Sequence, residues 1–380
     1  MNHVLRIGLG CLVSFTSVSA FAFAPSERST TTPKDVSALI APVVEKHDIP
    51  GMAVAVIRNG ETIATGVAGV RTRGKPDRIA INDRFHIGSD TKAMTAMLCG
   101  ILVEEGKLKW DQTIGQTFPE FERSMHPLYH DVTLEQLLTN RGGVPGDLQR
   151  DGLWGKLWQH KGTPTSARRL LLQGVTAHAP EATPGEKYIY SNAGFSIAGH
   201  MAEKVTGKPW ETLMREKIFR PLGMSSAGFG PPGTRAKNDQ PRGHKSDGTP
   251  VEPGPSADNP VAIGPAGIVH CSIGDWAKFM AANLPGGKTK LVKPETLQKL
   301  HTPPPGIPPY SMGWLVVNNQ PWADGEALTH AGSNTMWYAV AWLAPERDFA
   351  VVVVCNQPDS GACNDAVLAL IGECLPNDDR

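Results

Sequence analysis

The sequence lacks an excess of charge of either sign, because 37 Lys and Arg residues balance 37 Asp and Glu residues over 380 positions. It also shows no basic stripe and no acidic tail. Proteins that bind nucleic acids or anionic membranes usually carry such an excess, so we expect neither kind of partner. Charged residues make up 19% of the chain and hydrophobic residues 40%, which predicts a folded protein with a large core.

Cysteine is scarce, with six residues, and none of them forms a Cys-x-x-Cys pair or a cluster with histidine. Zinc-type metal sites need such clusters, so we expect no metal site. Cys99 lies in an apolar segment and is typical of a small core residue. Cys363 and Cys374 could form a bridge in an oxidising compartment, although unpaired thiols fit the sequence equally well.

Long apolar runs are absent beyond the N-terminus, so we expect no stable membrane span in the mature protein. At the N-terminus, Arg6 precedes the run IGLGCLVSFTSVSAFAFA, and Ala20-Phe21-Ala22 places small residues where a signal peptidase reads the chain. We predict that residues 1–22 are a signal peptide and that the protein is exported, either periplasmic or secreted. A membrane anchor and a lipoprotein site at Cys11 are the alternatives.

Strand patterns occur near both ends of the remaining chain. The stretch GMAVAVIRNGETIATGVAGV, which starts at Gly51, alternates small and apolar residues on both sides of Asn59-Gly60, a typical two-residue hairpin turn. Three further strands are predicted between positions 311 and 355, the last two joined by a turn at 344–348. The chain therefore begins and ends with strands.

Helical spacing of apolar residues dominates the middle of the chain. It covers the ranges 133–139, 166–173, 192–206 and 210–219. A helix start is predicted at Thr133, because Gln136 follows three positions later. Residues 231–267 are rich in Pro, Gly, Asp and Asn, which favours a long surface loop, and a last helix is expected near 364–374.

These elements predict an α/β (α+β) fold. Residues 33–88 and 310–380 would build an antiparallel sheet from both termini, flanked by helices. Residues 89–309 would form a mostly helical domain with long loops, inserted between the two parts of the sheet domain. A ligand site usually lies where two such lobes meet, so we expect the active site between them.

The stretch HIGSDTKAMTAMLCGIL opens an apolar helix with Ser89 and Lys92 three positions apart. Residues at this spacing share one helix face. A serine hydroxyl needs a base to become a nucleophile, and partial burial of Lys92 would lower its pKa enough for that duty. A helix-capping serine followed by a solvated lysine is the alternative.

Two other short patterns carry groups of the right kind. Tyr190 and Asn192 precede a predicted helix, where a tyrosine hydroxyl can relay protons and an asparagine amide can hold a carbonyl group. His330, Gly332 and Ser333 precede a predicted strand, where glycine allows close backbone approach and an N–H can face an oxyanion. Alone, the first pattern fits a turn tyrosine and a helix-capping asparagine better, and the second is unspecific because His86-Ile87-Gly88 and His160-Lys161-Gly162 also match it.

In this order and spacing, the three patterns resemble those of the serine β-lactamase and penicillin-binding-protein superfamily. The chain is most similar to the class C-like branch, which includes class C β-lactamases, D-alanyl-D-alanine carboxypeptidases and family VIII-type carboxylesterases. The resemblance extends from about Ser37 to Gly372, and the stretches PGEKYIYSN and IFRPLGM carry it more specifically than the short motifs. It implies a β-lactamase/transpeptidase-like fold.

The resemblance also implies roles for the residues of the three motifs. Ser89 would be the acylated nucleophile, Lys92 and Tyr190 would share general-base and proton-relay duty, and Asn192 would hold the carbonyl of the substrate. The backbone N–H groups of Ser89 and Ser333, beside Gly332, would form the oxyanion hole. His330 would take the place of a lysine. No metal or organic cofactor is implied.

The expected activity is that of an exported serine hydrolase that cleaves small esters, amides or D-amino-acid peptide bonds. A β-lactamase or D-alanyl-D-alanine carboxypeptidase is the alternative, and a non-catalytic binding module is a third hypothesis. His330 argues against an efficient β-lactamase, because a histidine with an ordinary pKa is mostly uncharged at neutral pH. Two patterns are set aside: Ser196 lacks the preceding strand that a nucleophile elbow needs, and Lys288 lacks a following glycine.

Overall fold

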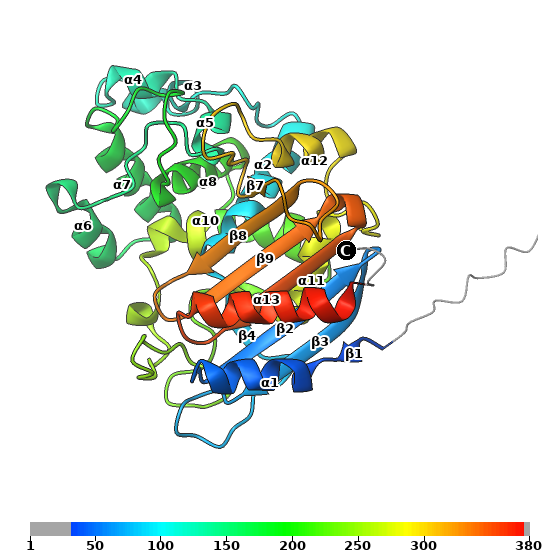
Figure 1. The fold of residues 1–380 in the computed structure, drawn as a ribbon. Coiled ribbons are helices and arrows are strands. Elements are labelled where there is room, and N and C mark those ends of the chain that lie inside the picture. The colour runs from blue at the N-terminus through cyan, green and yellow to red at the C-terminus, as the bar shows by residue number, and fades with distance from the viewer. Residues whose placement is uncertain (1–31, 376–380) are drawn as a thin grey trace, which may run out of the picture. The chain divides into compact units, whose positions relative to one another are not determined.

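One sheet gathers strands from both ends of the described chain (Figure 1). The structure is a computed structural model that describes residues 32–375, so the predicted signal peptide lies outside the described residues. The strand order is β1-β3-β2-β10-β9-β8-β7, and all neighbouring strands are antiparallel except β1 and β3. The strands are β1 (Lys34–Asp35), β2 (Gly51–Arg58), β3 (Glu61–Gly69), β7 (Leu315–Val317), β8 (Ala327–Ser333), β9 (Tyr338–Ala344) and β10 (Phe349–Cys355).

The centre of the sheet is apolar on both faces. Strands β2 and β10 pair residue by residue, with Val54 opposite Val353, and nearly all of their residues are buried. Such continuous apolar strands form where both faces of a sheet are covered. The predicted turn joins β2 to β3, and its residues Asn59 and Gly60 have φ angles of 51° and 71°. These positive values match the turn that favours Asn-Gly.

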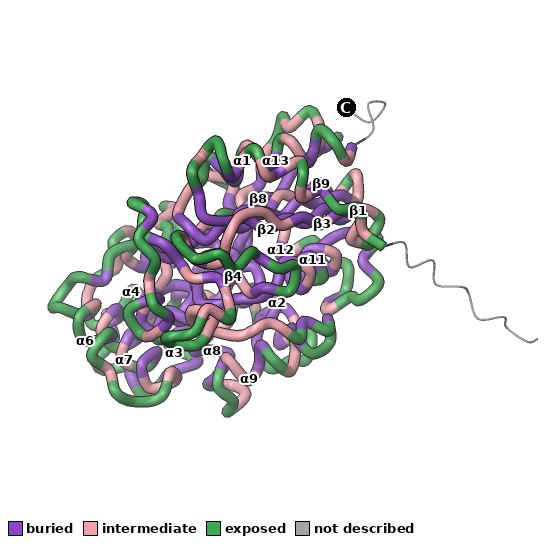
Figure 2. Tube along the Cα trace, turned by 90° about the horizontal axis from the view of Figure 1, so that it is seen from below, coloured by how far each residue is buried: buried purple, intermediate pink, exposed green. Residues whose placement is uncertain are grey.

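Helices cover both faces of the sheet. On one face lie α1 (Ser37–Lys46) and α13 (Ser360–Cys374), which pack against each other and the strands in Figure 1. On the other face lies α11 (Ile273–Ala282), which contacts β2 and β10. Figure 2 shows β2 and α2 within the buried, purple part of the chain, with exposed green segments around them.

The middle of the chain is mostly helical, as predicted. Besides α11, its helices are α2 (Thr91–Glu104), α3 (Ile114–Thr117), α4 (Pro127–His130), α5 (Leu134–Leu138), α6 (Leu153–Gln159), α7 (Pro164–Thr176), α8 (Asn192–Thr206), α9 (Trp210–Met214), α10 (Gly264–Gly267) and α12 (Pro294–His301). A small sheet of β4 (Arg84–His86), β6 (Val269–Ser272) and β5 (Gly228–Phe229) lies among them. The helix start at Thr133 is confirmed, because Thr133 and Gln136 form a capping box.

Several elements differ from the sequence-based expectations. Helix α1 was not predicted, and His330 to Ser333 form the end of strand β8 instead of only preceding a strand. The end of the expected surface loop, residues 262–267, is buried against α2 and α8. No helix within residues 32–375 is both long and apolar enough to cross a membrane.

The proposed pairing of Cys363 with Cys374 is wrong for this structure. Both residues lie in α13, where eleven positions separate them by about 16 Å along the axis. That distance is far beyond the reach of a disulfide. The Cys363 sulfur instead lies 3.5 Å from the sulfur of Cys355, and all cysteines of the described residues are free thiols.

Candidate active site

Ser89 lies in a tight turn that leads directly into α2. The turn is the short 3₁₀ segment η1 (Gly88–Asp90), and the Ser89 side chain is partly exposed there. Neither η1 nor α2 has a side-chain N-terminal cap, so Ser89 does not serve as one. The hydroxyl is therefore available at the start of an otherwise buried helix.

Lys92 is fully buried, and three oxygen atoms surround its ammonium nitrogen. Its Nζ lies 3.0 Å from Ser89 Oγ, 2.8 Å from Asn192 Oδ1 and 2.9 Å from the carbonyl oxygen of Ala266. The amide and carbonyl oxygens can only accept, so each must take an N–H from Lys92. The third direction faces Ser89, and in the neutral amine it holds the lone pair. This geometry aims a base at the Ser89 hydroxyl.

Burial sets the charge of Lys92. Loss of solvent lowers the pKa of Lys92 to about 7, and the nearby Asp90 opposes this shift only in part. Burial also raises the pKa of the Asp90 carboxyl well above its usual range. This shift reduces the negative charge that Asp90 places beside Lys92. Lys92 is thus uncharged in a large fraction of molecules near neutral pH.

The loop before α8 brings Tyr190 and Asn192 to the same place. Ser191, not Asn192, caps α8, because its hydroxyl accepts the N–H of Gly194. This leaves the Asn192 side chain free to contact Lys92. The Tyr190 ring centroid lies 4.7 Å from Lys92 Nζ. Loss of solvent raises the pKa of Tyr190 although 39% of its surface is exposed, and a hydrogen bond with Ser89 opposes the shift in part. Tyr190 therefore stays protonated at neutral pH.

The backbone of strand β8 packs against the backbone of η1, which we call the nucleophile turn after the role predicted for Ser89. A Cβ atom on Gly332 would lie 2.0 Å from the Ile87 carbonyl oxygen and 2.6 Å from the Ser89 nitrogen. A Cβ atom on Gly88 would lie 2.4 Å from the Ser333 nitrogen. Only glycine fits at both positions. The contact brings the backbone nitrogens of Ser89 and Ser333 into the same region, which the predicted oxyanion hole requires.

His330 is an uncharged residue in this structure. Burial, together with the positive charge of Lys92, lowers the pKa of His330 to about 3. The Tyr310 hydroxyl lies 3.0 Å from Nε2 of His330, and the Tyr190 ring lies 6.4 Å from the histidine ring. A lysine at this position would offer a cation, but His330 offers none.

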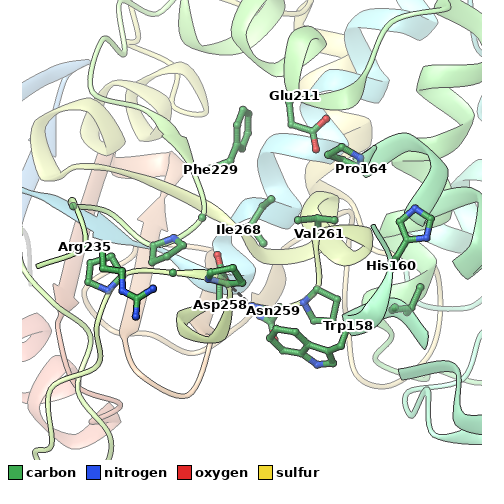
Figure 3. Close-up of a pocket in the computed structure, with 18 residues that line it drawn as sticks. Trp158, His160, Pro164, Glu211, Phe229, Arg235, Asp258, Asn259, Val261 and Ile268 are labelled. Atoms are coloured by element: carbon green, nitrogen blue, oxygen red, sulfur yellow. Dashed lines mark hydrogen bonds between the residues drawn. The ribbon is translucent and has the colours of Figure 1, made fainter. Parts of the chain in front are cut away.

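Two cavities bear on the position of the site. The first, of about 350 Å³, is lined by His330 and by Tyr188, Tyr190 and Tyr310. The second, of about 530 Å³, is shown in Figure 3 with Arg235 on one side and Trp158 on the other. The second cavity is larger but holds none of the motif residues. We therefore place the candidate site at the first.

The two patterns that were set aside lie apart from this cluster. Ser196 is buried in α8, and its hydroxyl donates to the carbonyl of Asn192 in the same helix. Lys288 is exposed and pairs with Glu61. No group of three or more metal-ligating side chains occurs within residues 32–375.

Sequence reasoning missed two contributors to the cluster. The Ala266 carbonyl contacts Lys92, but a backbone group leaves no signal in the residue type. Tyr310 contacts His330, yet it lies at the end of a proline-rich connector that gave no reason to single it out. The only signal for Tyr310 in the sequence is its aromatic side chain directly before the predicted strand.

The chain is similar to known proteins over most of its length. The sequence profile of the family described as Beta-lactamase matches residues 36–373. The Unguisins hydrolase ungD′ of Aspergillus campestris (strain IBT 28561) is 29% identical over 342 residues, which cover 85% of this chain and 61% of that protein. The chain thus spans less than two thirds of the length of that relative.

Two solved structures share the architecture. The octameric penicillin-binding protein homologue from Pyrococcus abyssi has a TM-score of 0.70 at 24% identity, over 88% of this chain and 76% of that chain. The D-alanine carboxypeptidase AmpC from Burkholderia cenocepacia has a TM-score of 0.70 at 21% identity, over 89% of this chain and 97% of that chain. The β-lactamase/transpeptidase-like fold predicted from the sequence is confirmed.

Proposed function

The chain belongs to the Beta-lactamase family, and on that premise we propose that it is a serine hydrolase that forms an acyl-enzyme on Ser89. The observation that carries the proposal is the arrangement around Lys92, whose third tetrahedral direction points at Ser89 Oγ over 3.0 Å. A neutral lysine in that position removes a proton from the serine hydroxyl as the oxygen attacks.

The proposed reaction has two halves. Ser89 Oγ attacks the substrate carbonyl carbon while its proton passes to Lys92 Nζ, and the N–H groups of Ser89 and Ser333 hold the oxyanion. Tyr190, whose hydroxyl bonds Ser89, gives a proton to the leaving group and regains one from the Lys92 side. Water then attacks the acyl group as one of its protons passes to the Lys92–Tyr190 pair, and that pair returns a proton to the departing Ser89 oxygen.

The proposed substrates are small esters, amides and D-amino-acid peptides that need no cation at position 330. Asn192 supports this assignment, because its amide oxygen is occupied by Lys92 and its amide N–H₂ group is left to hold a substrate carbonyl. The neutral His330 supports substrates without a carboxylate at that point. Export through a signal peptide at residues 1–22 is part of the proposal.

One observation favours a second function, that of a D-alanyl-D-alanine carboxypeptidase or β-lactamase. Arg141 is buried, and its Nε and one terminal nitrogen, Nη2, have no hydrogen-bond partner within the described residues. Its charge acts on Tyr188, which lines the cavity beside His330. Such a cation could receive a substrate carboxylate in place of a lysine. Arg141→Gln would then weaken binding of carboxylate-bearing substrates while neutral esters keep their KM.

The experiment that tests the proposal follows the intact mass over time. Mature protein and Ser89→Ala are mixed separately with a short-chain aryl ester and with a penicillin. We expect only wild type to consume the ester. We expect neither protein to carry a lasting penicillin adduct. A lasting penicillin adduct on wild type would instead favour the penicillin-binding peptidase. No reaction of any kind would leave the binding-module hypothesis.

A further inference from the structure

His86 lies next to the nucleophile turn but takes no part in the proposed reaction. It is the last residue of β4, two positions before Gly88, and it is completely buried. Its strand partner is His270, and it is not among the residues that line the cavity beside His330. Its hydrogen bonds, however, lead to the turn that carries Ser89.

The two ring nitrogens of His86 form different hydrogen bonds. The backbone N–H of Gly88 donates to Nδ1 over 3.1 Å. A nitrogen that accepts a hydrogen bond carries no proton, so the proton of the neutral ring lies on Nε2. Nε2 is 3.0 Å from a carboxylate oxygen of Asp258, to which it donates. Asp258 therefore fixes the tautomer in which His86 can accept the Gly88 N–H.

The Gly88 N–H needs this acceptor. Gly88 has a φ angle of +52° and precedes the first turn of a helix, where backbone N–H groups have no helical acceptor. A Cβ atom on Gly88 would lie 2.4 Å from the Ser333 nitrogen, so Gly88 packs closely on the end of β8. A small rotation at Gly88 would move both the Ser89 hydroxyl and the Ser89 N–H. The bond to His86 fixes the Ile87–Gly88 peptide, which directly precedes the peptide that carries the Ser89 N–H.

Asp258 is itself held in place. One of its oxygens accepts the N–H of Asn259 over 2.7 Å, and the side-chain N–H₂ group of Asn334 lies 3.4 Å from the same oxygen. Asn334 directly follows Ser333 at the end of β8. Figure 3 shows Asp258 on the wall of the larger cavity, beside Asn259. One carboxylate thus links the nucleophile turn to the strand that supplies the second oxyanion donor.

We propose that His86 is a positioning residue for acylation of Ser89 and that Asp258 orients it. The inference rests on the proposed function, because it assigns His86 to that same reaction. It concerns the orientation of the reacting serine and not substrate binding. A change at His86 should therefore slow acylation and, for an ester whose acylation limits turnover, leave KM unchanged.

Two matched variants separate the bond that His86 accepts from Gly88 from its contact with Asp258. In His86→Asn the amide oxygen can occupy the place of Nδ1 and still accept the Gly88 N–H, while the contact with Asp258 is lost. In His86→Gln the amide can reach Asp258, while the acceptor for Gly88 is lost. The readouts are the rate of Ser89 labelling by a fluorophosphonate probe and the KM of an aryl ester.

We expect His86→Gln to slow labelling about tenfold and His86→Asn to stay within about threefold of wild type, since an unsatisfied buried N–H is costly. KM should not change in either. Equal labelling rates for the two variants would overturn the inference. If His86→Gln does not fold, Asp258→Asn decides: a several-fold slower rate supports it, and an unchanged rate overturns it. A wild type without any labelling would contradict the proposed function itself, and the inference with it.

Discussion

At the scale of single residues, burial has changed the charge of the groups on which the proposed chemistry depends. Lys92 is fully buried and has a pKa of about 7, whereas an exposed lysine stays protonated far above neutral pH. His330 loses its charge for the same reason. The site therefore combines a base that titrates near neutral pH with an uncharged histidine, and its activity should follow the protonation of Lys92.

The first prediction concerns pH. Only unprotonated Lys92 can accept the Ser89 proton, so kcat/KM for an aryl ester should rise as pH increases through about 7 and then level off. Lys92→Met should lose at least about a hundredfold in rate and the pH-dependent step with it. A profile that is flat between pH 6 and pH 8 in wild type would show that Lys92 is not the base.

Part of the site could be predicted from single residues and part could not. The spacing of Ser89 and Lys92 and the pair Tyr190 and Asn192 point to the residues that the structure brings together. The Ala266 carbonyl could not be predicted, because any residue has one. The pairing of His86 with Asp258 joins positions 172 apart in the sequence, and no local pattern connects them.

At the scale of elements, the critical contact is the one between β8 and the nucleophile turn. Strand β8 was not predicted, because ALTHAGS has small and polar residues where a strand usually has large apolar ones. Pairing with β9 determines the strand instead. By contrast, α8 was predicted with its bounds, because its apolar spacing ends at Gly207, which has the φ angle of 69° typical of a helix end.

The second prediction follows from this contact. Gly332→Ala would place a Cβ atom 2.0 Å from the Ile87 carbonyl oxygen, so β8 and the turn must separate. We expect Ser89 labelling to slow by at least about a hundredfold, as when an oxyanion donor is lost. Gly274→Ala, in α11 with open space around the new atom, is the control and should retain full activity. Equal activity of the two variants would mean that the close approach is not needed.

The third prediction concerns cysteines. When the protein is refolded with oxidised glutathione, the Cys355 and Cys363 thiols should pass two protons and two electrons to it and form a disulfide, because their sulfurs lie 3.5 Å apart. Peptide mapping should show this link and a loss of about 2 Da. The Cys355→Ser variant should show none. A bridge between Cys363 and Cys374 would contradict the position of both residues in α13.

At the scale of the whole molecule, the sheet and the helical insertion share the site. Ser89 and Lys92 belong to the start of the insertion, Tyr190 and Asn192 to its centre, and Ser333 to the returning part of the sheet. Strands at both chain ends made this closure predictable, because the two ends had to share one sheet. The loop at 231–267 was not predictable, because its buried end is determined by packing against α2 and α8 and not by its composition.

The fourth prediction concerns the N-terminus. Full-length protein produced in a bacterium that exports it should begin at Phe23, because cleavage after Ala22 follows the small residues at positions 20 and 22. N-terminal sequencing of the exported protein checks this. A chain that still begins at Met1 would favour a membrane anchor, and one that begins at a lipidated Cys11 would favour a lipoprotein.

The measurement that tests the central claim most directly is the location of the acyl group. Wild-type protein is quenched in acid during turnover of an aryl ester, digested, and its peptides are sequenced by mass spectrometry. The account predicts the acyl mass on the peptide that contains Ser89, and on no other peptide. An acyl group on Ser196 or another residue, with Ser89 unmodified and ester still consumed, would contradict it.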